Sequence, residues 1–268
     1  MKILVTGATG NVGRLVVDEL LALGATDVRA LTVDPVKAAL PPRVDVVTGY
    51  LGKPSTLPAA FEGVDRMYLA PLLGTVTEAT RMAAAAGVQH IVDLAGDKYT
   101  AWEPIERAVE DSGVAWTHLE TGEFMLNAQI WAPQIQRGDV VRDAYPDAAN
   151  APIALEDIAA VAARVLLTDS HEGRAYALTG PQTLTRREKV REIGQALGRE
   201  LIYEELAHDA AVAELTTVMG EHAGWYLDGV AQMVGYPQAV TTTVADIIGG
   251  PGTTFREWAA KNAALFRR

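Results

Sequence analysis

The sequence predicts an α/β protein in which helices cover both faces of a doubly wound parallel sheet. Short apolar segments rich in β-branched residues alternate with longer segments whose apolar residues recur every three to four positions. This alternation is typical of strands joined by crossover helices, and such crossovers build parallel sheets. With 268 residues, of which 49% are hydrophobic, the chain can bury one large core and a smaller additional lobe.

The first turn of the chain joins its clearest strand to its clearest helix. Ile3–Thr6 is short and apolar, as expected of a buried strand, and residues 11–23 carry a helical period that stops at Gly24. A glycine-rich turn lies between them. The free N–H groups and partial positive charge of a helix N-terminus suit a pyrophosphate, so we expect a dinucleotide to bind here.

Three glycines of this turn are spaced Gly-x-x-Gly-x-x-Gly. Gly7 allows a sharp turn, Gly10 lets the backbone approach phosphates, and Gly13 allows close packing of helix on sheet. A strand before the motif and a helix after it favour a dinucleotide site. The alternative is a turn with a structural role only.

Five further strands continue the alternation. They are expected at 27–33, 43–48, 64–70, 90–94 and 114–119, with helices ending near Gly63 and at 75–86 and 103–112 between them. The carboxyl ends of parallel strands meet at one edge of the sheet, where ligands bind. The expected cofactor-binding residues are therefore Gly7, Thr9, Gly10, Asn11, Val12, Gly13, Arg14, Thr32, Val33, Asp34, Lys37, Tyr50, Leu51, Ala70, Pro71, Leu72, Ala95, Gly96, Thr121 and Gly122.

The end of the second strand bears on which cofactor binds. An acidic residue there favours the ribose hydroxyl of NAD, whereas an arginine favours the phosphate of NADP. Asp34 follows Thr32 and Val33, and it either contacts the ribose or caps the next turn. The sequence therefore leaves both NADP(H) and NAD(H) as candidate cofactors.

The alternation loosens after Thr121. Helices are expected at 123–136, 156–167 and 206–234, short strands at 138–142 and 175–179, and helices opened by capping boxes at Thr185 and Thr254. We expect a Rossmann domain at 1–150, to which 151–180 partly returns, and a small α+β substrate lobe at 181–268. These pieces are too interleaved to fold as separate domains.

Composition excludes several other functions. The net charge of −11 argues against nucleic acid, and the absence of cysteine removes disulfides and thiolate chemistry. The five histidines show no metal-ligand spacing, so we expect no metal site. No apolar run approaches a membrane span of about 18 residues, and no leader precedes the first strand. We expect a cytoplasmic monomer or homodimer acting on a small molecule.

Several segments together resemble the NmrA-like group of atypical short-chain dehydrogenases/reductases. They are Thr6–Arg14, Val28–Leu31 with Asp34 and Pro35, Ser112–Leu119, Phe124–Asn127, Glu156–Ala162, Leu178–Pro181 and Phe255–Trp258. The group includes NAD(P)H-dependent quinone and dye reductases as well as redox-sensing regulators. The resemblance spans almost the whole chain and implies a Rossmann fold that binds NAD(P)H.

The chain departs from the wider superfamily where carbonyl reduction needs a Tyr-x-x-x-Lys pair. Glu103 stands four residues after Tyr99, so the pair is absent, and Ala95 and Gly96 stand where a serine is usual. One explanation is hydride transfer to a conjugated acceptor that needs no such pair. A second is a non-catalytic regulator that binds the cofactor. A third is a non-redox epimerase or cyclase.

Residues just past the fifth strand are candidates for chemistry near the nicotinamide. Tyr99, with Lys98 beside it, is a candidate proton donor or a pocket wall. Candidate substrate contacts are Leu73, Trp102, Phe124, Asn127, His222 and Trp225. The alternative is packing within the lobe for Phe124 and Asn127, and core packing for Trp225. His118 on the sixth strand is expected to be a hydrogen-bonded core histidine.

Overall fold

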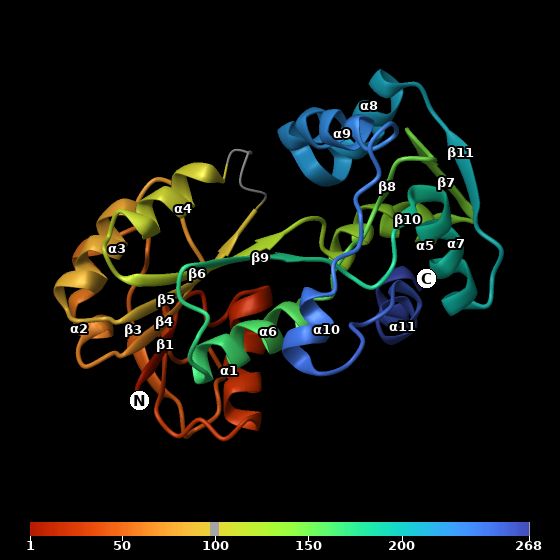
Figure 1. The fold of residues 1–268 in the computed structure, drawn as a ribbon. Coiled ribbons are helices and arrows are strands. Elements are labelled where there is room, and N and C mark those ends of the chain that lie inside the picture. Colours follow the sequence, from red (N-terminus) through yellow and green to blue (C-terminus); the bar gives the residue numbers. More distant parts are fainter. Residues whose placement is uncertain (97–101, 268) are drawn as a thin grey trace. The chain divides into compact units, whose positions relative to one another are not determined.

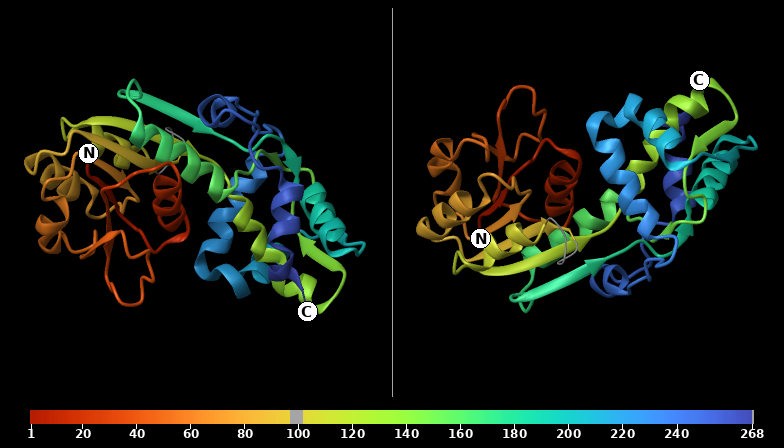
Figure 2. Two further views of the ribbon diagram at one scale, coloured as in Figure 1. Left: turned by 90° about the horizontal axis from the view of Figure 1, so that it is seen from below. Right: turned by 90° about the horizontal axis from the view of Figure 1, so that it is seen from above.

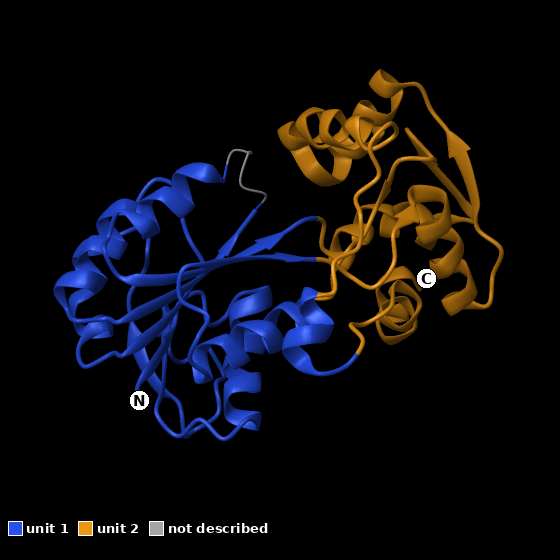
Figure 3. Ribbon diagram, viewed as in Figure 1, with its two compact units in different colours: residues 1–122, 155–178, 243–250 blue, residues 123–154, 179–242, 251–268 orange. Residues whose placement is uncertain are grey.

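The structure is a computed structural model that describes residues 1–96 and 102–267. The chain forms two compact units, each built from three separate stretches of sequence (Figure 3). Unit 1 comprises residues 1–122, 155–178 and 243–250, and unit 2 comprises 123–154, 179–242 and 251–268. The domain division expected from the sequence stays a prediction.

Unit 1 is built on a parallel sheet, which confirms the predicted fold class. Within the described residues this sheet has seven strands in the order β3-β2-β1-β4-β5-β6-β9 (Figure 1). The order reverses between β1 and β4, which is the point where doubly wound sheets bind ligands. The strands are β1 (Ile3–Val5), β2 (Val28–Thr32), β3 (Asp45–Thr48), β4 (Arg66–Leu69), β5 (His90–Ala95), β6 (Ala115–Thr121) and β9 (Arg174–Leu178).

Two groups of helices cover this sheet, one on each face (Figures 1 and 2). The first group is α1 (Asn11–Ala22), α6 (Leu155–Leu167) and α10 (Thr243–Ile248); α6 packs against both of the others. The second is α2 (Pro58–Phe61), α3 (Val76–Ala85) and α4 (Glu103–Glu110), which share one apolar core with β1, β4 and β5. Burial of both faces at the centre of the sheet explains why β1 is apolar and buried throughout, whereas the edge strand β3 has exposed residues at both ends.

Unit 2 has a separate core around Trp131, Phe255, Trp258 and Phe266. Its two small sheets pair β7 with β11 in parallel and β8 with β10 in antiparallel. Its regular elements are α5 (Ala132–Arg137), β7 (Val140–Asp143), β8 (Ala149–Asn150), β10 (Leu184–Thr185), α7 (Arg186–Leu197), β11 (Ile202–Glu205), α8 (His208–Met219), α9 (Ala223–Gln232) and α11 (Phe255–Lys261).

The helix predicted over 123–136 is wrong as a single α-helix. Met125–Trp131 is a 3₁₀ helix, and α5 begins only at Ala132. Pro133 has no N–H to donate to the carbonyl of Gln129, and that carbonyl accepts a hydrogen bond from Ala132 instead. Both predicted capping boxes are confirmed, at Thr185 and at Thr254.

Candidate functional site

The glycine loop between β1 and α1 is folded as a tight turn. The Gly10 N–H donates to the carbonyl of Gly7 at 2.8 Å, and Gly7 adopts a φ of +59° that favours glycine. A Cβ on Gly13 would lie 2.2 Å from the Gly7 carbonyl oxygen, so only glycine lets α1 approach the turn this closely. A Cβ on Gly10 would meet only the Gly7 oxygen, at 3.2 Å, and is otherwise open.

The N-terminus of α1 has the features of an anion-binding site. Gly10 occupies the N-cap position, no side chain caps the described turn, and no acidic residue lies in the first turn. Thr9 and Asn11 are exposed and Val12 is buried. Arg14, one turn along, pairs with Asp18 at 3.2 Å and donates to the carbonyl of Ala39. The residues present therefore fit a diphosphate held by backbone N–H groups.

At the end of β2, the carboxylate of Asp34 caps the following turn. Its Oδ1 accepts hydrogen bonds from the N–H groups of Val36 and Lys37, both at 3.1 Å. The Lys37 ammonium lies 3.4 Å from the other carboxylate oxygen. Thr32 is buried and Val33 is 65% exposed. The capping alternative is thus present, and the roles of these residues toward a ribose stay predictions.

Two residues at the ends of β3 and β4 are fixed by local contacts. The Tyr50 ring lies against Gly52, where a Cβ would come within 2.4 Å of it, and Leu51 is buried. The Ala70 N–H donates to the hydroxyl of Thr6 at 2.9 Å, which ties the end of β4 to the glycine loop. Pro71 is half-buried, whereas Leu72 and Leu73 are exposed.

Beyond β5 and β6 the described residues again lie at the strand ends. Ala95 is buried, and its carbonyl accepts a hydrogen bond from the Thr121 hydroxyl at 3.2 Å, next to the exposed Gly122. The ring of Trp102 packs against Gly96 so closely that a Cβ there would lie 2.1 Å from it. The candidate proton donors Lys98 and Tyr99 lie outside the described residues.

The remaining substrate candidates belong to unit 2. Asn127 and Trp225 line the same cavity, and Phe124 lines a smaller neighbouring space. His222 is exposed and does not line either of them. These four assignments stay predictions.

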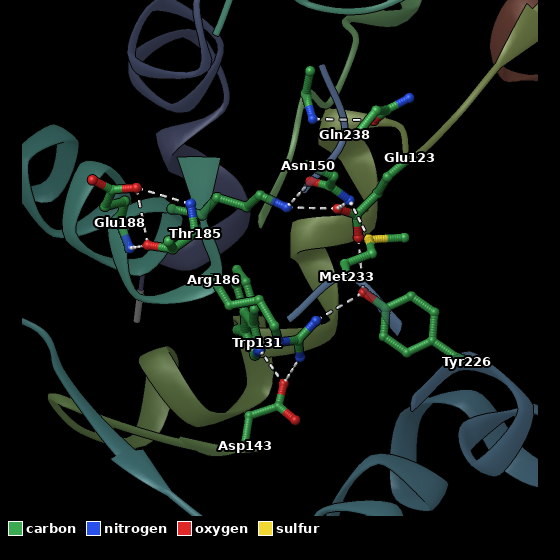
Figure 4. Close-up of polar contacts among 12 residues, drawn as sticks. Glu123, Trp131, Asp143, Asn150, Thr185, Arg186, Glu188, Tyr226, Met233 and Gln238 are labelled. Atoms are coloured by element: carbon green, nitrogen blue, oxygen red, sulfur yellow. Dashed lines mark hydrogen bonds and ion pairs between the residues drawn. The ribbon is translucent and has the colours of Figure 1, made fainter. Parts of the chain in front are cut away.

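Unit 2 also contains a buried polar network that the sequence did not reveal (Figure 4). The Lys189 ammonium lies 2.6 Å from the Glu123 carboxylate and also hydrogen-bonds Asn150. Burial would raise the pKa of Glu123, but the charge and hydrogen bond of Lys189 outweigh it and hold this pKa at about 2. No local motif signals the network, because Lys189 and Glu123 are 66 residues apart.

The network continues through Tyr226 to a second ion pair. The Tyr226 hydroxyl donates to Glu123 at 2.8 Å and accepts from the Arg186 guanidinium at 3.1 Å. Arg186 also pairs with Asp143, which accepts a hydrogen bond from the indole of Trp131 at 2.7 Å. Burial raises the pKa of Tyr226, with a smaller contribution in the same direction from Glu123, so this hydroxyl keeps its proton at neutral pH.

The predicted core histidine is confirmed in unit 1. His118 is 1% exposed, and its Nδ1 lies 2.7 Å from the carboxylate of the buried Asp93. Burial would lower the pKa of His118, but the hydrogen bond to Asp93 raises it. Both side chains are buried between β5 and β6, in register with Leu69 at the end of β4.

The described residues show neither a metal-binding cluster nor a membrane-spanning helix. No three or more His, Asp or Glu side chains of residues 1–96 and 102–267 gather closely enough to hold a metal ion. Over the same residues, no helix has the length and apolar character needed to cross a membrane.

Comparison with known proteins identifies a family model and full-length relatives. The model, described as NAD(P)H-binding, matches residues 7–169. A (4-alkanoyl-5-oxo-2,5-dihydrofuran-3-yl)methyl phosphate reductase of Streptomyces griseus is 39% identical, with 98% of this chain and 99% of that protein aligned. An NAD(P)H azoreductase of Xenophilus azovorans is 33% identical over the same shares of the two chains.

A solved structure shares the fold. The NADPH-dependent quinone oxidoreductase QOR2 of Escherichia coli, in complex with NADPH, superposes with a TM-score of 0.85 at 25% identity. The match covers 97% of this chain and 99% of the other.

Proposed function

This chain belongs to the NAD(P)H-binding family, and we propose that it is an NAD(P)H-dependent reductase that passes hydride to a small, apolar, conjugated acceptor such as a quinone. The observation that carries the proposal is the glycine loop, whose turn leaves Gly10 open beside an uncapped helix N-terminus. The named reductase relatives support it, since they align along their whole length.

In this proposal the chain binds and orients while the cofactor carries the redox chemistry. When bound, the nicotinamide cofactor supplies the hydride. The N–H groups that follow Gly10 hold the diphosphate, Asp34 and Lys37 border the ribose, and Leu72 lines the path to the acceptor. No Tyr-x-x-x-Lys pair is needed, because a reduced quinone takes its proton from water or from a nearby polar group.

The test compares acceptors that differ in their need for an acid. NADPH and NADH consumption is followed by absorbance with a quinone, an azo dye, a furan-based phosphate ester and a simple ketone. We expect the quinone to be reduced and the ketone not, because an isolated carbonyl needs a proton donor for its alkoxide. Replacing Tyr99 by Phe lowers turnover at least roughly tenfold if this residue donates the proton.

Calorimetry with all four nicotinamide nucleotides provides the independent check. If none binds more tightly than about 1 mM, which corresponds to roughly 4 kcal/mol, the reductase proposal fails. If the nucleotides bind but no acceptor is reduced, the reductase proposal fails, and a regulator or a non-redox enzyme on the same scaffold takes its place.

A further inference from the structure

The end of β2 in unit 1 bears on which of the two nicotinamide nucleotides the chain takes. NADP(H) differs from NAD(H) by one phosphate on the 2′-hydroxyl of the adenosine ribose, and in dinucleotide folds the end of the second strand meets this ribose. β2 pairs with β1 as far as Val5 and Ala30, so residues 32–34 continue beyond this pair on the side of the glycine loop. The charges around Asp34 are therefore the ones to consider.

The carboxylate of Asp34 is held in place by the turn that follows it. Its Oδ1 accepts hydrogen bonds from the N–H groups of Val36 and Lys37, both at 3.1 Å. The Asp34 N–H in turn donates to the hydroxyl of Thr32 at 3.3 Å. The N–H groups of this turn are thus occupied by the protein's own carboxylate instead of being open to a phosphate. The Asp34 side chain is nevertheless 40% exposed, so its Oδ2 can still accept a hydrogen bond from a ribose hydroxyl.

Two cations contact the segment 34–39, and each is paired with a carboxylate. The Lys37 ammonium lies 3.4 Å from Oδ2 of Asp34. The Nε of Arg14 lies 3.2 Å from the carboxylate of Asp18, and another nitrogen of the same guanidinium donates to the carbonyl of Ala39 at 3.2 Å. Each pair is neutral as a whole. Neither pair therefore supplies the net positive charge that favours a phosphate, which carries about two negative charges.

Val33 adds no polar group at this strand end. Its side chain is 65% exposed and has neither a charge nor a hydrogen-bonding atom. A 2′-phosphate at this position would lose part of its hydration and would stand near the Asp34 carboxylate, which has the same sign of charge. The free ribose hydroxyl of NAD(H) can instead donate a hydrogen bond to that carboxylate.

We propose that Asp34 makes the chain selective for NAD(H) over NADP(H). The inference rests on the proposed function, because it names the nucleotide that the same glycine loop takes. The two oxygens of the carboxylate divide the work. Oδ1 caps the turn at Val36 and Lys37, and Oδ2 accepts the hydrogen bond of the ribose, while the negative charge of the group disfavours the additional phosphate.

The test measures the binding of NADH and of NADPH to the full chain by calorimetry, which does not depend on catalysis. We expect NADH to bind at least roughly tenfold more tightly than NADPH. In Asp34→Asn the side-chain oxygen can still accept the two N–H groups, but the negative charge is lost and Lys37 is released from its ion pair. NADPH should therefore bind roughly tenfold more tightly to this variant than to the native protein.

A gain-of-function variant takes the same test further. The double variant Val33→Arg/Asp34→Asn adds a guanidinium at the exposed strand end, and a guanidinium binds phosphate through two parallel hydrogen bonds. We expect this variant to prefer NADPH over NADH. Lys53, in the turn after the neighbouring strand β3, is a further exposed cation. Lys53→Met should leave the ratio of the two affinities unchanged, because the phosphate is not recruited there.

The matched control removes one negative charge from the opposite end of β2. The backbone carbonyl of Glu62 accepts a hydrogen bond from Arg29 near the start of β2, and the residue is exposed. Glu62→Gln should therefore leave the preference unchanged. Equal affinities for the two nucleotides in the native protein, tighter binding of NADPH, or equal effects of Asp34→Asn and Glu62→Gln would overturn the inference. Preferred binding of NADH without reduction of any acceptor would contradict the proposed function alone.

Discussion

At the scale of single residues, two glycines of the same loop should respond differently to substitution. A Cβ on Gly10 would approach one atom closely, the Gly7 carbonyl oxygen at 3.2 Å, so Gly10→Val should fold but fill the phosphate position. We expect the affinity for NADPH to fall by at least about a hundredfold, because helix N-termini bind phosphate through close backbone contacts, while the melting temperature falls by much less than in Gly13→Ala.

Gly13, the second glycine of the loop, and Gly138, outside it, serve as controls for that substitution. Gly13→Ala should destabilise the protein itself, because its Cβ would lie 2.2 Å from the Gly7 carbonyl oxygen. Gly138 has nothing within 4 Å of a Cβ and an extended backbone, so Gly138→Ala should change neither property. Normal NADPH binding by Gly10→Val would place the diphosphate elsewhere.

His90 should make the stability of the protein depend on pH. Its Nε2 lies 2.9 Å from the hydroxyl of Thr117, and that hydroxyl donates to the carbonyl of His171, so Nε2 must carry the proton. Burial, and secondarily the charge of Arg66, lowers the pKa of His90 to about 4. In the unfolded chain this histidine takes up a proton near pH 6.5, whereas in the folded protein it does so only near pH 4. The free energy of unfolding therefore decreases as the pH falls from 6.5 to 4.

This loss can be measured against a variant that does not titrate. Between pH 7.5 and pH 5 the free energy of unfolding should fall by about 2 kcal/mol more in the native protein than in His90→Gln, whose amide can still donate to Thr117. Urea unfolding at the two pH values gives both quantities. Parallel curves for the two proteins would show that His90 does not titrate in this range.

At the scale of elements, α7 is joined to the segment before the 3₁₀ helix by one buried ion pair. Lys189 on α7 is 3% exposed, and removing it leaves the Glu123 carboxylate buried without its cation. We expect Lys189→Met to cost about 3–5 kcal/mol of stability, and the double variant Glu123→Gln/Lys189→Met to cost much less. Chemical denaturation of the three proteins tests this; a double variant as unstable as the single one would contradict it.

The helices and strands also show which structural features sequence patterns can predict. The loop at Gly7–Gly13 and the capping boxes at Thr185 and Thr254 were predictable because each depends on residues within a few positions of one another. The two-residue strands β8 and β10 carry too few residues for a period-two pattern, so the sequence did not indicate them. The 3₁₀ helix at 125–131 was hidden because its apolar spacing is compatible with an α-helix.

The candidate site was predictable to the same limited extent. Residues at the ends of parallel strands could be placed at one edge from their order alone. The side-chain contacts around these residues could not be predicted. The packing of Trp102 against Gly96, and of Tyr50 against Gly52, is set by the folded structure and not by a local sequence pattern. The Glu123 network could not be predicted for another reason, because Asn150 and Lys189 are distant from Glu123 in the sequence and contact it only in the folded chain.

At the scale of the whole molecule, the two units should unfold together. The chain passes between them five times, after residues 122, 154, 178, 242 and 250, so neither unit is one continuous stretch. Losing one unit would leave the segments of the other joined only by flexible loops, and closing such loops costs entropy. We therefore expect one cooperative transition, with the same midpoint reported from both units.

Cofactor binding provides the decisive perturbation of this transition. NADPH at a hundred times its dissociation constant should stabilise the folded chain by about 2.7 kcal/mol. Because unfolding is cooperative, the slowest-exchanging amides of β7 and β11 in unit 2 should gain as much hydrogen-exchange protection as those of β1 and β4 in unit 1. Protection confined to unit 1 would show that the glycine loop binds the cofactor in a domain that unfolds independently of unit 2.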